Sequence, residues 1–287
     1  MVNVDATESF KTAMADANIV VYEPIIADGH LHRVYVEGDK RGTKNGAYIL
    51  HLDGKPAGWA HHFRTGATIT WSVNGNRQRM TKAMRRQIDE ERLRQQQERE
   101  MRQAKVALRA RYIWRRVIPL QLRTHPYLIR KHIDSFGLKI DRHGVLIVPI
   151  YNIDNALVNL QFIDADGNKR FLAGGRKAGC FSTIGTYRQG DPLIVCEGWA
   201  TGASIHQDCG HFVVVAMDAG NLEPVARAFR MLNANADIII AGDNDVSGVG
   251  QSAARKAALA VGGRYMIPPT IGNDWNDELS VKAVSRA

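Results

Sequence analysis

Apolar and polar positions alternate in blocks along the C-terminal third of the chain, from Pro192 onward. Four apolar runs have the length of strands, namely Leu193–Cys196, Phe212–Met217, Asp237–Ala241 and Arg264–Ile267. The stretches between them, 200–208, 222–234 and 248–261, have the composition of helices. Strands that are apolar throughout are typical of a parallel sheet buried on both faces. The pattern therefore predicts an α/β domain over residues 191–287, with a parallel-type sheet and helices on both faces.

A different pattern, short strand-forming runs separated by turn residues, occupies residues 19–73. The runs are Leu31–Val36, Ala47–Leu52, Ala57–Phe63 and Thr68–Val73. Asn45-Gly46 and Asp53-Gly54 suit hairpin turns because Asn, Asp and Gly tolerate positive φ. We expect a small N-terminal antiparallel β-module within residues 1–76. Three of its aromatic residues either form the core of the sheet or provide a stacking surface for bases, and they are Trp59, Phe63 and Trp71.

The next segment, 77–140, is helical in composition and strongly basic. Residues 77–117 contain almost no Gly or Pro and are dense in Arg, Gln, Glu and Ala, which favours one long helix. Between Arg77 and Arg130 there are 16 Lys/Arg against 5 Asp/Glu, whereas the net charge of the whole chain is +9. The helix is either a solvated spacer or an arm that contacts DNA. The residues best placed to contact phosphate are Arg109, Arg111, Arg115 and Arg116.

Strand character returns over 141–190. Val145–Ile150, Leu157–Ile163 and Arg170–Leu172 have strand composition, and Asp164-Ala165-Asp166-Gly167 suits a turn. Residues 173–190 are expected to form a glycine- and basic-rich loop. The segment is therefore predicted to be a β-rich subdomain.

Acidic residues follow the predicted strands of the C-terminal domain. Glu197 comes directly after the first strand, and Asp243 and Asp245 follow the third. Ligands of α/β sheets bind at the carboxyl ends of the strands, and side chains two residues apart leave the same face of an extended backbone. Clustered carboxylates repel one another unless cations are present, and oxygen ligands suit Mg²⁺ or Mn²⁺. We therefore expect these acids to hold two such ions, about 3.5–4 Å apart, for chemistry on phosphodiesters.

The alternative is that Asp243 and Asp245 cap the following helix while Glu197 pairs with an arginine. Asp218 and Asp277 are weaker metal-ligand candidates, since either residue can equally cap a helix. No zinc site is predicted, because the three cysteines lack finger or ribbon spacing.

The combination of a glutamate turn and a later Asp-x-Asp resembles the Toprim domain, which bacterial-type primases, topoisomerases, certain nucleases and recombination mediators share. A narrower resemblance concerns Glu197-Gly198-Trp199-Ala200-Thr201-Gly202. It is similar to the EGYATA signature of conjugative-plasmid primases and satellite-phage primase–helicases, with Trp199 replacing tyrosine and Gly202 replacing the last alanine. Elements between His125 and Gly185 are similar to the region that precedes Toprim in those proteins, so that an α+β primase-type subdomain is implied there.

The resemblance implies a DNA primase of a mobile genetic element that makes short primers on single-stranded DNA from nucleoside triphosphates. Asp243 and Asp245 would then hold the metal that activates the primer hydroxyl, and Glu197 would bind metal or relay a proton. By match, the residues that hold nucleotide and template are Lys169, Arg170, Arg176 and Lys177, although these can also belong to a solvated basic hairpin.

Two other functions stay open at this stage. The same fold can serve a metal-dependent nuclease or strand-passage enzyme, and the chain can be a non-catalytic DNA-binding replication accessory protein with vestigial acids. No Walker-type GxxxxGK[ST] motif occurs in the sequence, so a helicase or a single-strand binding protein would act in trans. The absence of a long apolar run or a signal-peptide pattern favours a cytoplasmic protein without a membrane partner.

Overall fold

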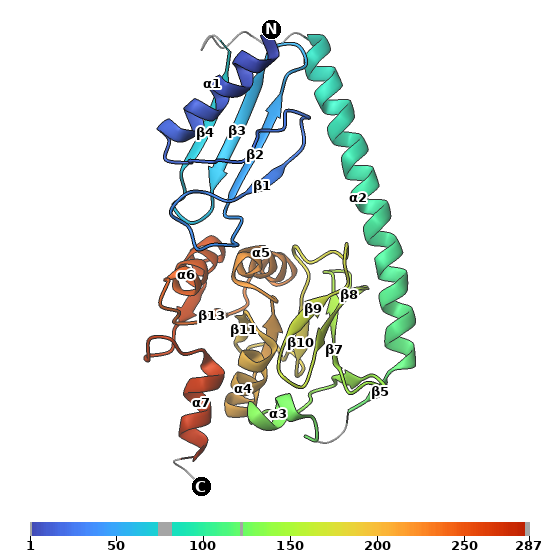
Figure 1. Cartoon of the computed structure of the whole chain (residues 1–287). Coiled ribbons are helices and arrows are strands. Elements are labelled where there is room, and N and C mark those ends of the chain that lie inside the picture. Colours follow the sequence, from blue (N-terminus) through green and yellow to red (C-terminus); the bar gives the residue numbers. More distant parts are fainter. Residues whose placement is uncertain (1, 74–81, 121–122, 285–287) are drawn as a thin grey trace. The chain divides into compact units, whose positions relative to one another are not determined.

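The computed structural model describes residues 2–73, 82–120 and 123–284 (Figure 1). The chain forms two compact units, Met1–Ile88 and Asp89–Ala287. The expected division between residues 76 and 77, and the expected start of the long helix, lie outside the described residues.

The N-terminal unit is a four-stranded antiparallel sheet covered on one face by helix α1 (Val2–Asp16). Its strands pair in sequence order and are β1 (His32–Val34), β2 (Gly46–His51), β3 (Ala57–His62) and β4 (Thr68–Ser72). Phe10 and Met14 of α1 are fully buried against this sheet. A Cβ on Gly58 would lie 2.6 Å from the Phe10 ring, so glycine at this position lets the helix approach β3. The predicted antiparallel module is confirmed.

One predicted turn of this module is wrong. Gly54 has φ 71° and closes the turn between β2 and β3, as expected for Asp53-Gly54. Gly46 instead lies inside β2, paired with Val34 and His62. A Cβ there would lie 2.6 Å from Val36 Cγ2, so this glycine serves close packing between strands and not a turn.

The long helix α2 (Lys82–Arg116) begins in the first unit and continues into the second, where it packs on an antiparallel sheet. The strands of that sheet, in their order across it, are β5 (Ile118–Pro119), β6 (Lys139–Ile140), β7 (Leu146–Tyr151), β8 (Leu157–Ile163) and β9 (Lys169–Phe171). Ala110, Ile113 and Trp114 of α2 contact Ile147 and Leu160. The arginines of this part of the helix are exposed, and Arg111 also donates from Nε to the carbonyl of Leu157 in β8. A short helix α3 (Pro126–Arg130) joins β5 to β6.

A second five-stranded sheet forms the C-terminal part, in the order β10-β12-β11-β13-β14. Its strands are β10 (Ser182–Ile184), β11 (Leu193–Cys196), β12 (Phe212–Val215), β13 (Ile238–Ala241) and β14 (Arg264–Met266). The last four run parallel, as predicted. However, β10 pairs antiparallel with β12, so the sheet is mixed, and part of the expected 173–190 loop is an edge strand.

Helices cover both faces of this sheet, which confirms the predicted layers. One face packs against α4 (Trp199–Cys209), and the other packs against α5 (Leu222–Leu232) and α6 (Val249–Val261). A single turn, η1 (Ala219–Asn221), precedes α5, and α7 (Trp275–Val284) lies against α4. Leu146 and Val148 of β7 share a core with Trp199 of α4, so that the two sheets of the second unit are joined by buried contacts. Among the described residues, no helix is long and apolar enough to cross a membrane.

Candidate active site at the carboxyl ends of the parallel strands

Three neighbouring parallel strands end at the same edge of the mixed sheet, and an acid follows each of them. Cys196 of the central strand β11 lies level with Val215 of β12 and Ala241 of β13. Glu197, Asp218 and Asp243 come next along these three strands, and all three residues line one cavity of about 460 Å³. The topology therefore brings together acids that the sequence separates.

Glu197 and Asp243 lie side by side, because the backbone N–H of Asp243 donates to the Glu197 carboxylate. Glu197 Oε1 and Asp243 Oδ1 are both buried without a hydrogen-bond partner. Burial, followed by the charges of Asp243, Asp245 and Asp218, raises the pKa of Glu197 to about 7. Burial, followed by the charge of Asp274, raises the pKa of Asp243 to about 6. Two half-buried carboxylates that each hold a buried oxygen without a hydrogen-bond partner are a disfavoured arrangement, and a cation bound between them would relieve it.

Asp245 has a different environment from Asp243. Its carboxylate accepts hydrogen bonds from the Ser247 hydroxyl and from the backbone N–H groups of Val249 and Gly250, at the start of α6. These bonds lower its pKa. The chain has left the extended conformation after Ala241, so the rule that residues two apart share a face does not apply here. Asp245 therefore caps α6, while its charge still reaches Glu197.

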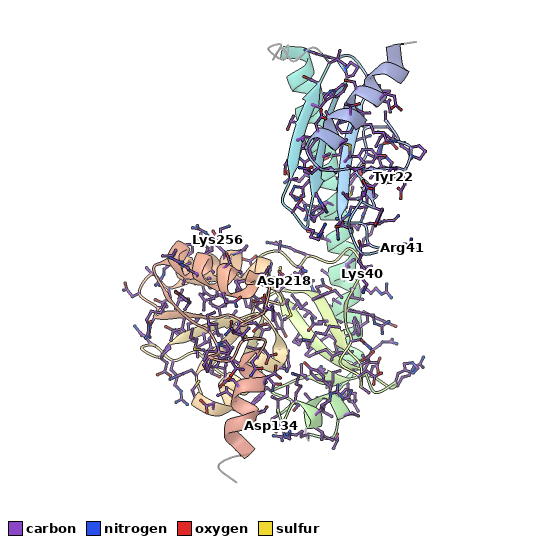
Figure 2. The ribbon with its side chains drawn as sticks, turned by 60° about the vertical axis from the view of Figure 1, so that its left-hand side comes forward. Tyr22, Lys40, Arg41, Asp134, Asp218 and Lys256 are labelled. Atoms are coloured by element: carbon purple, nitrogen blue, oxygen red, sulfur yellow. The ribbon has the colours of Figure 1, made fainter. Side chains whose placement is uncertain are left out.

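Asp218 (labelled in Figure 2) is shared between a cap and an ion pair. Its Oδ1 accepts from the backbone N–H of Asn221, and its Oδ2 lies 2.6 Å from Lys177 Nζ. Lys177 belongs to the glycine- and basic-rich loop, so this pair ties the loop to the edge of the mixed sheet.

Three further charged residues near the site come from segments that are distant from Glu197 in the sequence. They are Lys131, Asp274 and Asp277. Asp274 lines the cavity, and its Oδ1 accepts from the backbone N–H of Asp277. Asp277 instead points to Lys131, with Oδ1 3.1 Å from Lys131 Nζ. Sequence reasoning did not single out Asp274, although it follows the last strand as the other acids follow theirs. No pattern in the sequence pointed to Lys131, because its partner Asp277 lies 146 positions away.

The cavity also presents cations beside the acids. Arg130, Lys131 and Lys169 line it. Lys169 is exposed along its stem, but its ammonium group reaches the Glu197-Gly198 turn, where a Cβ on Gly198 would lie 3.8 Å from Nζ. Desolvation lowers the pKa of Lys169, and the neighbouring acids Asp274 and Asp243 oppose this shift. The amino end of α4, at Gly198 to Thr201, opens on the same cavity, and such helix ends favour anions.

The acids fit a divalent cation that takes part of its coordination from a substrate. In the described part of the chain, no group of three His, Cys, Asp or Glu side chains has ready metal-ligand geometry. That Glu197, Asp243 and Asp245 hold a metal together stays a prediction. Mg²⁺, however, commonly binds one or two carboxylates together with water and substrate phosphates. The two unpartnered oxygens of Glu197 and Asp243 suit that kind of site.

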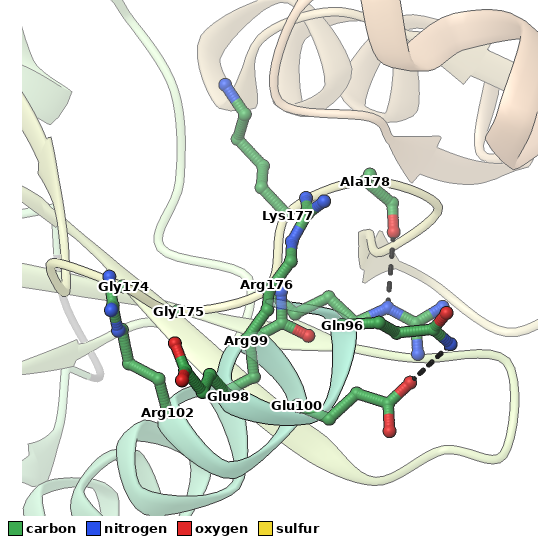
Figure 3. Close-up of a pocket in the computed structure, with 11 residues that line it drawn as sticks. Gln96, Glu98, Arg99, Glu100, Arg102, Gly174, Gly175, Arg176, Lys177 and Ala178 are labelled. Atoms are coloured by element: carbon green, nitrogen blue, oxygen red, sulfur yellow. Dashed lines mark hydrogen bonds between the residues drawn. The ribbon is translucent and has the colours of Figure 1, made fainter. Parts of the chain in front are cut away.

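A larger cleft, of about 1160 Å³, lies between α2 and the loop 174–178 (Figure 3). Its wall contains four cations against two carboxylates, and the cations are Arg99, Arg102, Arg176 and Lys177. Gly174 and Gly175 bring the loop close, since a Cβ on them would lie 3.1 Å from Arg102 Cδ and 2.5 Å from Asn159. The cleft meets the cavity at the ion pair of Lys177 with Asp218.

The remaining predicted phosphate contacts lie at the surface. Arg109, Arg111, Arg115 and Arg116 are all exposed on α2. Arg116 stacks over the exposed Tyr112 ring, 4.1 Å from its centroid, whereas Trp114 packs toward the sheet under Lys139. Arg170 is exposed on β9, next to Lys169. The structure therefore places Lys169 in the cavity, Arg176 and Lys177 in the cleft, and the α2 arginines on a separate exposed face.

Comparison with known proteins gives this arrangement a family. Residues 192–284 match the family model of the Toprim domain. The match covers strands β11 to β14 and the helices between them. Over 286 residues the chain is 33% identical to DNA primase TraC of Escherichia coli, covering 92% of this chain and 26% of that protein. A second DNA primase TraC of Escherichia coli is 36% identical over 257 residues, covering 85% of this chain and 18% of that protein. The chain thus spans about a quarter or less of the length of these relatives.

Among solved structures, the chain is similar to the primase fragment of the bacteriophage T7 primase-helicase protein. That similarity has a TM-score of 0.42 at 18% identity and covers 55% of this chain and 70% of the other. The Aquifex aeolicus primase, with its zinc-binding and RNA polymerase domains, also gives a TM-score of 0.42, at 10% identity, over 98% of this chain and 83% of the other.

Proposed function

We propose that this chain is the catalytic part of a DNA primase, which joins nucleotides on a single-stranded DNA template. The observation that carries the proposal is the pair of buried, unpartnered oxygens of Glu197 and Asp243, in one cavity with Lys169, within the residues that match the Toprim domain. The similarity to the two primases named TraC supports polymer synthesis over other chemistry of the same fold.

Glu197 and Asp243 are the residues that would hold Mg²⁺ or Mn²⁺, with Asp274 adding negative charge from the third side. Two ions are expected, as in other phosphoryl-transfer sites with clustered carboxylates. When bound, such ions lower the pKa of an attacking hydroxyl and stabilise charge on the transferred phosphate. Asp245 would support the site through its charge while it caps α6.

The cations and the helix end of the cavity would bind the triphosphate. Lys169, Lys131 and Arg130 can donate to phosphate oxygens, and the amino end of α4 adds backbone N–H groups. In the reaction, the primer 3′-oxygen forms a bond to the α-phosphorus and loses its proton. The bond from that phosphorus to the bridging oxygen breaks, and pyrophosphate leaves. Holding both reactants in one cavity lowers the entropic part of the barrier.

The cleft between α2 and the loop 174–178 would carry the template. Its four cations suit a phosphate backbone, and it meets the cavity at the pair of Lys177 with Asp218. Arg170 and the exposed α2 arginines, Arg109, Arg111, Arg115 and Arg116, would extend this contact.

The motif resemblance supports a role in the replication or transfer of a plasmid, phage or integrative element. Under this proposal the protein works in the cytoplasm, and a replicative helicase or a single-strand binding protein acts with it in trans.

The test is primer synthesis on mixed-sequence single-stranded DNA, with labelled ribo- or deoxyribonucleotides and Mg²⁺ or Mn²⁺. Asp243→Asn should abolish products. Asp237→Asn is the matched control, because Asp237 precedes the same strand and pairs with Arg264 at the opposite edge of the sheet. Absence of product from the unmodified chain, or an active Asp243→Asn variant, would falsify the proposal. Cutting of DNA without nucleotides would instead indicate a Toprim nuclease.

A further inference from the structure

The two faces of the N-terminal sheet differ in what covers them. Alternate residues of β3, Gly58 and Ala60, are buried under α1. Trp71 also belongs to that side, since its ring lies 5.6 Å from the Phe10 ring. Trp59 and His61 leave β3 on the opposite side, and Phe63 continues their row with 53% of its surface exposed. The three aromatic residues predicted for this module are thus divided between the core and an open face.

On this face the three rings form a row in which each ring contacts the next. Trp59 and His61 lie in nearly parallel planes and stack, with centroids 5.8 Å apart and an interplanar angle of 10°. His61 meets Phe63 edge to face at 4.6 Å. His61 Nδ1 is also 2.6 Å from the Thr68 hydroxyl, which fixes the middle ring. Phe63 is exposed, whereas Trp59 and His61 are half-buried. Rings that are already ordered lose little entropy when a flat ligand stacks on them.

The charges around these rings suit a polyanion. The exposed Arg33 guanidinium lies 4.3 Å from the centroid of Phe63, and it donates to the carbonyl of Lys44, whose side chain is also exposed. The neighbouring acid Asp39 does not oppose them, because its carboxylate is buried and bonded to His62 and Arg64. The side chains opposite the rings on β2 and β4 are uncharged, namely Ala47, Ile49, Thr68 and Thr70.

We propose that this face, defined by Arg33, Trp59, His61 and Phe63, binds single-stranded nucleic acid by base stacking. Bases of a single strand can stack on the rings, while Arg33 and Lys44 contact phosphate. Side chains two residues apart on a strand are spaced about 6.5–7 Å. Bases stacked along one strand of a duplex are about 3.4 Å apart, so the rings are spaced about twice as far apart as the bases. The paired bases of a duplex are held at the smaller spacing and cannot stack on successive rings. The site is separate from the catalytic cavity and belongs to the other unit of the chain.

The test is photochemical crosslinking of the full chain to a thymidine-rich single strand that carries 5-iodouracil, with crosslinked peptides identified by mass spectrometry. We expect crosslinks on the peptide that contains Trp59 and Phe63. The Asp243→Asn protein should give the same crosslinks, so that failure here is distinguishable from failure of the primase proposal.

Affinity measurements on variants complete the test. Trp59→Ala and Phe63→Ala should each weaken binding of the single strand at least about fivefold, whereas Trp59→Phe should retain most of the affinity. Tyr22→Ala is the matched control, since Tyr22 (labelled in Figure 2) is an exposed ring of the same unit that hydrogen-bonds to Glu37 and makes none of the ring contacts of the row. Crosslinks confined to residues 89–287, with unchanged affinity in the alanine variants, would overturn the proposal and leave a protein partner as the occupant of the face.

Discussion

The two units of this chain carry their candidate functional residues on different parts of a sheet, at the strand ends in one unit and on a sheet face in the other. In the Toprim domain, α4 covers one face of the sheet and α5 and α6 cover the other, so the central strands β11, β12 and β13 are mostly buried along their length. In the N-terminal unit, α1 covers one face of an antiparallel sheet, and among the described residues no other helix packs on the opposite, open face. Glu197 and Asp243 accordingly lie past strand ends, whereas Trp59 and Phe63 lie on or directly beside the surface of the open face.

The difference follows from how the strands are connected. Parallel strands need crossover helices, which bury both faces and gather the ends of several strands at one edge. Such an edge collects polar groups from distant segments and holds them partly buried, where charges interact strongly. An open antiparallel face gathers alternate residues of consecutive strands, remains solvated, and suits stacking with a polymer. The first arrangement suits bond-making chemistry, and the second suits binding.

The largest effect that separates the two regions is expected from Glu197→Gln. Loss of one of the two unpartnered carboxylates should lower the rate of primer synthesis about 100-fold or more, because several kcal/mol of metal-dependent stabilisation disappear. Crosslinking of single-stranded DNA to the peptide that contains Trp59 and Phe63 should not change. Glu223→Gln is the control, since Glu223 only pairs with Arg227 and Lys256 on the surface. A Glu197→Gln enzyme that retains most of its activity contradicts the assignment.

The next effect distinguishes the two acids at the start of α7. Asp274→Asn should reduce primer synthesis about tenfold, because it removes the charge nearest to Asp243 but keeps a residue that caps the helix well. Asp277→Asn should have a smaller effect, since Asp277 contacts Lys131 and not the paired carboxylates. Rates measured over a range of Mg²⁺ concentrations check this order. The reverse order would make Asp277 the member of the site.

A smaller effect concerns stability as a function of pH. The folded pKa of Glu197, about 7, exceeds its ordinary value of 4.5, so the folded protein binds more protons between these values than the unfolded chain does. The free energy of unfolding of the metal-free protein should therefore fall as pH rises from about 4.5 to 7. We expect a loss of about 1 kcal/mol, well below the full linkage value because the site is partly solvated.

Thermal unfolding across this pH range, with and without Mg²⁺, measures the effect. Mg²⁺ should restore stability near neutral pH. Glu197→Gln should remove part of the pH dependence, and the raised pKa of Asp243 should account for the rest. Stability that rises with pH over the same interval in the absence of metal would contradict the burial of these carboxylates.

The smallest effect is expected at the junction of cleft and cavity. Lys177→Met should weaken binding of the single strand about threefold and reduce the salt dependence of binding by about 0.7 in log–log slope, as expected for one lost phosphate contact. The Lys177–Asp218 pair is itself half exposed, so its own contribution to stability is small. A double-mutant cycle with Asp218→Asn measures their coupling. An unchanged salt slope would place the template elsewhere.

Much of the fold was accessible from local pattern. The alternation of apolar runs and helical stretches predicts the four parallel strands and their helices, because crossover connections require that order. It did not predict β10, since the antiparallel pairing of Ser182–Ile184 with β12 depends on a long-range contact and not on local composition. Gly46 was misassigned for a related reason, because a glycine needed for close packing cannot be distinguished in sequence from one needed for a turn.

The site divides in the same way. The sequence by itself determined that Glu197, Asp218 and Asp243 each follow a strand, because the order of strands and acids is written along the chain. The sheet order β12-β11-β13, which brings the ends of these strands together, was decided by the tertiary structure. Only the tertiary structure decided which carboxylates face the cavity. It directed Asp245 to α6, brought Asp274 toward Asp243, and placed Lys131 next to a residue 146 positions away. The physical reason is that burial and charge proximity act through space, so they depend on how distant segments pack.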